Sequence, residues 1–252
     1  MIVTTDNYAL EARNVTKSFG SLIAVDNLDM TLQRGELYGF LGPNGAGKTT
    51  AINVFMGILK ADSGSVEVLG YPIPKGKRKA RALVGLMPQE VSLYEDLTVM
   101  EHLVFFGELY GMPRSEIRPK ADELLDVFGL EEKRNERVLN LSGGMKRRTS
   151  LCVALVHSPQ LVLADEPTVG VDPVLRVQFW NYFRKLQREE GTTFLVTTHV
   201  FDEAMKVDRI GMITNGRLVE EGKPQKVLDK YHASSLEDVF LKLYEEANGN
   251  AS

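Results

Sequence analysis

The residues with the clearest chemical potential are the glycines, the lysine and the hydroxyl residues of one short segment, Gly42–Thr50. Its pattern, G-x-x-x-x-G-K followed by Ser or Thr, is typical of loops that bind phosphate groups. The segment consists of Gly42, Pro43, Asn44, Gly45, Ala46, Gly47, Lys48, Thr49 and Thr50. A strand-like run at 36–41 precedes it and a helix-like run at 51–56 follows it, so the glycines fall where a strand turns into a helix. We therefore expect this segment to cradle the phosphates of a nucleotide.

Each part of this loop has a predicted role. Gly45 and Gly47 can adopt a positive φ without a Cβ clash, which lets successive backbone N–H groups and the following helix N-terminus point at a phosphate. We expect Lys48 to bridge the β- and γ-phosphates and the Thr49 hydroxyl to hold Mg²⁺. The alternative is a flexible glycine loop that binds no ligand. That alternative would not explain why the preceding strand, the glycine spacing, the lysine and the threonine all match the motif.

Two adjacent carboxylates, Asp165 and Glu166, follow the apolar run 161–164. Such a run is typical of a strand buried in a parallel sheet, and ligands bind at the carboxyl ends of those strands. Because neighbouring residues point in different directions, we expect one carboxylate to serve Mg²⁺ and the other to orient or deprotonate an attacking water. The alternative is a pair that caps a helix, which Pro167 disfavours.

A second glycine-rich helix start lies at 141–145, with the sequence Leu-Ser-Gly-Gly-Met. Ser142 is a natural N-cap for a helix that we expect to reach about His157, and this N-terminus predicts another anion site. The three cations 146–148 support that interpretation, because positive charge in a first turn opposes the helix dipole and is tolerated best when an anion is near. An ordinary capped helix with a solvated basic face is the alternative.

Composition narrows the class of protein. The chain has 252 residues with a net charge of −4, which argues against a protein that coats nucleic acid and allows one domain with a smaller lobe. The basic run 75–81 is expected to be a solvated turn and helix start, in preference to a patch for lipid or RNA.

The single cysteine, Cys152, lies in an apolar run and should behave as a small hydrophobe. Met1–Asp6 lacks the features of a signal peptide, and we expect a cytosolic chain that does not itself cross a membrane.

The remaining pattern predicts an α/β protein with a helical part. We expect a capping box of Thr98 and Glu101 at the start of the helical part, which extends to about residue 129. Asn215-Gly216 predicts a hairpin turn between strands at 210–213 and 218–220. The other expected strands lie at 9–19, 24–32, 36–41, 65–69, 84–87, 161–164 and 193–198, and a further helix lies at 174–190.

These motifs occur in a distinctive order. The phosphate loop is followed by Gln89, the Leu-Ser-Gly-Gly segment, an Asp-Glu-Pro strand end, Asp172 and His199. This order resembles the ATP-binding subunit of ABC transporters, from about Ala9 to Gly222. Within that superfamily, the segments 143–148, 165–173 and 235–240 resemble the multidrug and antibiotic exporter type, called ABC-2.

The resemblance implies a fold and a domain organisation. It implies an α/β P-loop NTPase core with a parallel sheet, an N-terminal antiparallel β subdomain and an inserted α-helical subdomain at about 90–158. Residues 1–233 would then form a single ABC ATPase domain. Residues 234–252 would form a C-terminal helix with a frayed tail.

The resemblance also implies roles for individual residues. Phe19 matches the aromatic that stacks on adenine, with a core phenylalanine as the alternative. Gln89 matches the glutamine that senses Mg²⁺ and faces the membrane partner, and His199 matches the switch histidine at the γ-phosphate, although a histidine after a strand is usually structural. Asp172 matches the loop that links two ATP sites.

The same resemblance implies that the Leu-Ser-Gly-Gly segment acts on a second subunit. Ser142, Gly143 and Gly144 match the signature that closes over ATP bound by the other subunit. Met145 departs from the pattern, which usually has Gln there, so a side-chain role at this position has no support.

The predicted function is therefore an ATPase, with ATP and Mg²⁺ as cofactors, that works as a head-to-tail dimer of ATP-binding subunits. Its predicted partner is a separate transmembrane permease that holds it on the inner face of the cell membrane and exports drugs, antibiotics or lipophilic compounds; no nucleic acid is expected. One alternative is a soluble ABC-type ATPase acting on ribosomes or DNA, which usually has two cassettes or a coiled-coil or zinc insertion. The other is a P-loop GTPase or kinase, which would leave the Leu-Ser-Gly-Gly segment unexplained.

Overall fold

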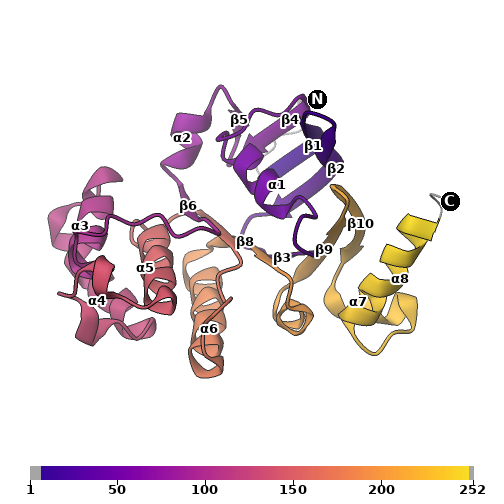
Figure 1. The fold of residues 1–252 in the computed structure, drawn as a ribbon. Coiled ribbons are helices and arrows are strands. Elements are labelled where there is room, and N and C mark those ends of the chain that lie inside the picture. Colours follow the sequence, from indigo (N-terminus) through magenta and orange to yellow (C-terminus); the bar gives the residue numbers. More distant parts are fainter. Residues whose placement is uncertain (1–6, 250–252) are drawn as a thin grey trace. The chain divides into compact units, whose positions relative to one another are not determined.

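The computed structural model describes residues 7–249, whose helices and strands Figure 1 labels. The chain forms two compact units. The first unit combines the residues up to Ala80 with those from Leu195 onward, and the second is Arg81–Phe194. The predictions made for Met1–Asp6 and for residues 250–252 lie outside the described residues.

An antiparallel sheet forms the N-terminal part of the first unit. Its strand order is β2-β1-β4-β5, and the strands are β1 (Tyr8–Phe19), β2 (Leu22–Gln33), β4 (Ser63–Val68) and β5 (Tyr71–Ile73). Strands β1 and β2 join through a turn at Gly20, where φ is 60°. Strand β4 begins at Ser63, before the expected start at residue 65. The sequence did not predict β5, because three residues that include a proline give no periodicity.

The phosphate-loop strand of the first unit lies between two others in the order β9-β3-β8. All five residues of β3 are buried, as expected for a strand of a parallel sheet that is covered on both faces. The adjacent β9 runs parallel to β3, and β10 returns antiparallel across the predicted Asn215-Gly216 turn. The bounds are β3 (Leu37–Leu41), β8 (Thr193–Thr198), β9 (Arg209–Thr214) and β10 (Arg217–Gly222).

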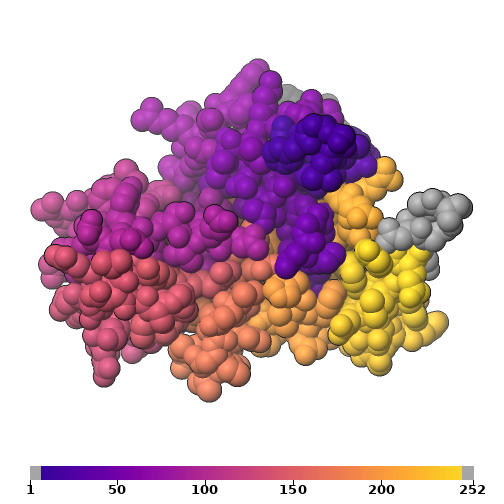
Figure 2. Space-filling view, viewed as in Figure 1, coloured from indigo at the N-terminus to yellow at the C-terminus, as the bar shows by residue number. Residues whose placement is uncertain are grey.

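The helices of the first unit include a C-terminal pair. The space-filling view shows this pair as a yellow region beside the orange segment that precedes it in the chain (Figure 2). The last of them, α8, buries Leu236, Val239, Phe240 and Leu243, which follow the spacing of one helix face. The basic run forms the short α2, whose Lys77, Arg78 and Lys79 are exposed, as predicted. The helices are α1 (Lys48–Phe55), α2 (Lys77–Arg81), the 3₁₀ helix η3 (Phe201–Lys206), α7 (Pro224–Tyr231) and α8 (Leu236–Gly249).

The second unit pairs two parallel strands with a group of helices. Gly85 of β6 lies directly against α5, since a Cβ there would come within 2.0 Å of the Ala154 carbonyl. The predicted capping box is present, because the Glu101 N–H donates to the Thr98 hydroxyl at 3.2 Å and the Thr98 N–H donates to the Glu101 carboxylate at 2.8 Å. The elements are β6 (Val84–Met87), α3 (Val99–Leu109), α4 (Arg114–Val127), η1 (Glu131–Lys133), η2 (Val138–Asn140), α5 (Gly143–Leu155), β7 (Leu161–Asp165) and α6 (Pro173–Glu190).

Cys152 lies on α5 inside the core of the second unit. It is fully buried, with its Sγ atom 3.9 Å from the Leu124 carbonyl oxygen, and burial raises the pKa of its thiol well above the ordinary value. The prediction that it acts as a small hydrophobe is confirmed. Within residues 7–249, the helices all fall short of the length and apolar character that spanning a bilayer requires.

Candidate nucleotide-binding site

The phosphate loop of the first unit has the backbone that its glycines predict. Gly45 and Gly47 have φ values of 82° and 106°, in the region that favours glycine. A Cβ on Gly47 would also come within 2.2 Å of the Ala24 carbonyl oxygen, so this position excludes a side chain for two reasons. Helix α1 begins immediately afterwards at Lys48. The N-terminus of this helix therefore adds its N–H groups and partial positive charge to the phosphate loop.

Lys48 crosses the mouth of this loop and is almost fully buried. Its ammonium donates to the carbonyl of Gly42 at 2.6 Å and to that of Pro43 at 3.0 Å. Carbonyl oxygens that hold an ammonium can give way to phosphate oxygens, which carry more charge and accept stronger hydrogen bonds. The loop therefore has the shape and the charge to accept a chain of phosphates.

His199 lies beside the start of the loop. It follows the last residue of β8, and the Gly42 N–H donates to the carbonyl of Thr198 at 3.4 Å. Gly42, Pro43, Asn44, His199, Phe201 and Phe240 line one cavity of about 270 Å³. The predicted proximity of His199 to the phosphate loop is thus present within this unit.

Two aromatic residues of this cavity were missing from the sequence prediction. Phe201 begins η3, and Phe240 comes from α8, with the ring centroids 5.4 Å apart. The spacing of apolar residues in α8 predicts a buried helix face, but no local pattern identifies the segment against which that face packs. Because Phe240 lies far from His199 along the chain, its place in this cavity could not be predicted from the sequence.

Phe19 stands at the end of β1 in the same unit. Its side chain is 48% exposed, so the alternative of a core phenylalanine is wrong. The ammonium of Lys17 lies 5.4 Å from the ring centroid and is paired with Asp62 at 2.9 Å. An exposed aromatic face beside a fixed cation is suited to stacking against a flat heterocycle.

The adjacent carboxylates belong to the second unit. Asp165 ends β7 and Glu166 follows it, and both are almost completely buried. Glu166 has a φ of 53°, an uncommon conformation for a residue with a side chain. The alternative of a helix-capping pair is wrong, because the next helix, α6, begins at Pro173 and is capped by Asp172.

The Leu-Ser-Gly-Gly segment forms the predicted capped helix start in the second unit. The Ser142 hydroxyl accepts a hydrogen bond from the Met145 N–H at 3.3 Å, and α5 begins at Gly143. Ser142 and Gly143 are exposed, and a Cβ on Gly143 would meet nothing within 4 Å. The helix N-terminus is therefore open to an incoming group.

The three cations of α5 do not have the role that we expected. Lys146 pairs with Glu95 at 3.4 Å, and Arg148 donates to the carbonyls of Phe128 and Gly129 at 2.9 and 3.0 Å. Arg147 donates to main-chain carbonyls as well. The interpretation that these cations indicate an anion is wrong, because a carboxylate and carbonyl oxygens within the unit already surround their charge.

Two further predicted residues have clear positions in the second unit. Gln89 is exposed two residues after β6, and its carbonyl accepts a hydrogen bond from Arg147 at 3.3 Å. The Asp172 carboxylate accepts from the N–H groups of Val174 and Leu175 at 3.1 and 3.0 Å. Asp172 thus caps α6, a structural role that the sequence analysis missed although Asp before Pro at a helix start is its usual signal.

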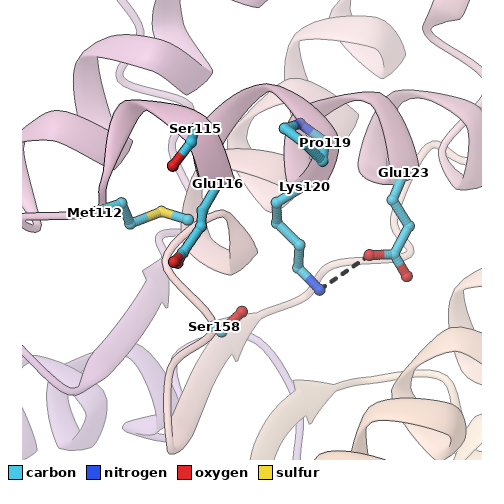
Figure 3. Close-up of a pocket in the computed structure, with 7 residues that line it drawn as sticks. All are labelled: Met112, Ser115, Glu116, Pro119, Lys120, Glu123 and Ser158. Atoms are coloured by element: carbon cyan, nitrogen blue, oxygen red, sulfur yellow. Dashed lines mark hydrogen bonds and ion pairs between the residues drawn. The ribbon is translucent and has the colours of Figure 1, made fainter.

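A separate hollow lies on α4 of the second unit (Figure 3). Lys120, the cation among its lining residues, is 3.1 Å from the Glu123 carboxylate and 3.6 Å from that of Glu190, so its charge is already neutralised. The other lining residues are Met112, Ser115, Glu116, Pro119, Glu123 and Ser158. This hollow does not have the character of a phosphate site.

Comparison with known proteins shows the family of this chain. The model of the family described as "ABC transporter" matches residues 25–169, which is more than half of the chain. This chain belongs to the ABC transporter family. The ABC subunit is 40% identical to the Nod factor export ATP-binding protein I of Sinorhizobium fredii, over 92% of its own length and 68% of that protein. It is 41% identical to the linearmycin resistance ATP-binding protein LnrL of Bacillus subtilis, over 84% and 68% of the two chains.

Other comparisons support the same assignment. The ABC subunit is 39% identical to ABC transporter G family member 23 of Dictyostelium discoideum, of which it spans 34%. A solved ATP-binding subunit of an ABC transporter superposes with a TM-score of 0.87 at 26% identity, covering 94% of this chain and 99% of the other. A dimeric bacterial ABC transporter cassette gives 0.80 at 28% identity, over 85% and 98%. The predicted resemblance, the fold class and the ATPase assignment are confirmed.

Proposed function

We propose that this ABC ATPase hydrolyses ATP to drive a separate membrane permease that exports drugs, antibiotics or other lipophilic compounds. The observation that carries the ATPase part is the phosphate loop, with its glycine backbone and the buried Lys48 across its mouth. The export part rests on relatives whose names describe Nod factor export and linearmycin resistance. The domain boundaries that we predicted, 1–233 and 234–252, are part of the same proposal.

In the first unit, the loop amides bind the phosphates, and Lys48 exchanges its carbonyl partners for the β- and γ-phosphate oxygens. The exposed ring of Phe19 stacks on adenine. His199, on the wall of the cavity beside the loop, contacts the γ-phosphate when the site closes. Bound Mg²⁺ would neutralise charge on the phosphates, and the oxygen atoms of Thr49, Gln89 and Asp165 are ligands of the kind this ion prefers.

Glu166 acts as the general base. Its carboxylate accepts a proton from the attacking water, while the carboxylate of Asp165, the last residue of β7, would hold Mg²⁺. The near-complete burial of both side chains supports a role for them in the reaction, because a carboxylate in a site that excludes water interacts more strongly with a reacting group.

Two copies of the subunit form the working enzyme, arranged head to tail. The exposed N-terminus of α5, with Ser142, Gly143 and Gly144, closes over ATP held by the partner's phosphate loop. The likeness to a dimeric ABC cassette supports this arrangement. ATP closes the dimer and hydrolysis reopens it, which delivers free energy as a conformational change.

A patch of exposed aromatic residues marks the surface that we assign to the permease. Tyr94 and Phe105 are 57% and 41% exposed, and their ring centroids lie 5.6 Å apart in an edge-to-face arrangement. Tyr94 follows Gln89 closely in the sequence, and large exposed apolar groups of this kind are typical of interaction surfaces. Docking there holds the subunit at the inner face of the cell membrane.

Copurification tests the proposal. The tagged subunit is isolated from membranes of its host, and the expected result is one polytopic membrane protein, with ATPase activity that rises when both are present. A Lys48→Ala subunit should copurify equally well without activity. Recovery with ribosomes or DNA, and no membrane protein, would replace the proposal with the soluble alternative.

A further inference from the structure

Arg147 of α5 holds the main chain of three residues to which the proposed function gives roles. Its Nε atom donates to the Glu166 carbonyl at 3.1 Å, Nη2 donates to the Asp165 carbonyl at 3.2 Å, and Nη1 donates to the Gln89 carbonyl at 3.3 Å. Nη2 also donates to the Glu166 carbonyl. One side chain thus joins the end of β7 to the segment that follows β6, within a single compact unit.

The chemistry of this contact favours a fixed geometry. A guanidinium is planar and presents several N–H donors at set angles, so three carbonyls bound to it cannot move independently. Arg147 is half-buried, and burial lowers the pKa of its guanidinium, whereas the nearby charges of Glu166 and Asp165 oppose that change. Hydrogen bonds from a charged donor are each stronger than neutral ones, which makes this connection rigid.

The backbone of Glu166 needs such support. At a φ of 53° a residue with a Cβ is strained, and it stays there when the surrounding contacts fix it. Its carbonyl, which receives two hydrogen bonds from Arg147, belongs to the peptide that leads into Pro167. Holding that carbonyl fixes the orientation of the Glu166 Cα, and therefore the direction in which its carboxylate leaves the main chain.

We propose that Arg147 is a positioning residue, which holds Glu166 in its catalytic orientation and couples it to the Gln89 segment. Arg147 acts through main-chain atoms and takes no proton itself. A displacement of Gln89, such as permease movement would cause, passes through the guanidinium to Glu166. This inference rests on the proposed function, in which Glu166 is the general base.

The chain offers a matched control in Arg148. It lies next to Arg147 on the same helix and also donates to main-chain carbonyls, but these belong to Phe128, Gly129 and Gly144 and not to Asp165 or Glu166. Arg148→Met and Arg147→Met each remove a guanidinium that binds carbonyls, so both should lower the melting temperature. Loss of turnover beyond that shared effect is specific to Arg147.

The test uses the full chain assembled with its permease and measures kcat, KM, ATP affinity and melting temperature. We expect Arg147→Met to lower kcat by about tenfold or more with KM and ATP affinity nearly unchanged, since orientation of the base matters after ATP has bound. Arg147→Lys keeps the positive charge but lacks the planar set of guanidinium donors, so its kcat should fall less than that of Arg147→Met. Arg148→Met should keep the wild-type kcat below its melting temperature.

Each result decides between the alternatives. An Arg147→Met enzyme with wild-type kcat, or an equal kcat loss in Arg148→Met, would overturn the positioning role. If Arg147→Met does not fold, Arg147→Lys carries the test, and wild-type kcat and permease stimulation in that variant would count against the proposal. Wild-type and Glu166→Gln enzymes are measured alongside, because full turnover by Glu166→Gln would refute the proposed base and not the contacts of Arg147.

Discussion

The rings of Phe201 and Phe240 lie in contact, with centroids 5.4 Å apart, and both line the cavity that contains His199. Phe201 follows His199 closely in the sequence, whereas Phe240 comes from the C-terminal helix α8. The helix that follows the proposed ATPase domain therefore packs against the segment that carries His199. The family resemblance implied a C-terminal helix, but its place beside the phosphate loop follows from the fold.

Phe240→Ala should weaken this packing. The side chain is 8% exposed, and removal of a buried phenylalanine costs roughly 3 kcal/mol of unfolding free energy. We expect a lower kcat as well, because η3 and His199 lose a neighbour, with a smaller change in ATP affinity. Denaturant unfolding and steady-state kinetics measure both effects. Leu241→Ala, at a position 53% exposed, is the control, and equal losses in the two variants would contradict a specific contact.

Lys48→Ala should weaken nucleotide binding itself. The ammonium lies across the mouth of the loop, bound to the carbonyls of Gly42 and Pro43, so it meets the terminal phosphates before any chemistry begins. Loss of a charge-assisted contact of this kind lowers affinity by about tenfold or more. Isothermal titration with ATP measures the change. Unchanged affinity would mean that phosphates bind elsewhere.

Glu166→Gln should bind ATP and fail to hydrolyse it. The amide keeps the size of the side chain but cannot accept a proton from water, whereas the phosphate loop remains intact. Because the dimer reopens on hydrolysis, ATP should hold this variant as a dimer. Size-exclusion chromatography with ATP detects that dimer, and phosphate release reports turnover. A rapid rate in this variant would remove Glu166 from the role of base.

Subunit mixing tests the role of Ser142 in the partner's site. Lys48→Ala and Ser142→Arg subunits should each be inactive alone. In a mixed dimer, a composite interface gathers both changes in one site and leaves the other intact, so partial activity should return. Differential tags verify that mixed dimers form. Activity that stays at the single-variant level in verified mixed dimers would argue that each site lies within one chain.

His157 should make the stability of the chain depend on pH. Its ring stacks on Tyr110 with centroids 3.7 Å apart, and burial lowers its pKa from 6.5 to about 4. Between these values the unfolded chain binds more protons than the folded one, so this contribution is complete above pH 6.5 and is lost as the pH falls towards 4. The loss is roughly 3 kcal/mol.

Urea unfolding at pH 7 and pH 4.5 measures that loss. The matched control is His157→Phe, which keeps an aromatic ring against Tyr110 and has no proton to bind. The wild type should lose more stability than this variant over the same pH interval. Parallel pH dependence in the two proteins would show that another group is responsible.

Sequence reasoning succeeded where the determinants are local. The phosphate loop was predictable because the strand, the glycines with positive φ and the helix start are consecutive, and the same is true of the Thr98–Glu101 capping box. It failed where the partner lies far along the chain. The cations of α5 were assigned to an anion because the sequence cannot show that carbonyls from the end of β7, from the residue after it and from the segment after β6 surround Arg147.

The burial of Cys152 makes the natural chain convenient for covalent labelling. Its thiol is inaccessible, and its raised pKa keeps it protonated and therefore unreactive towards maleimides near neutral pH. Since the sequence has no other cysteine, a thiol placed at an exposed position of choice would be the sole reactive group in the folded protein. Distances between fluorophores or spin labels on two copies could then follow opening and closing during turnover, without first replacing any native residue.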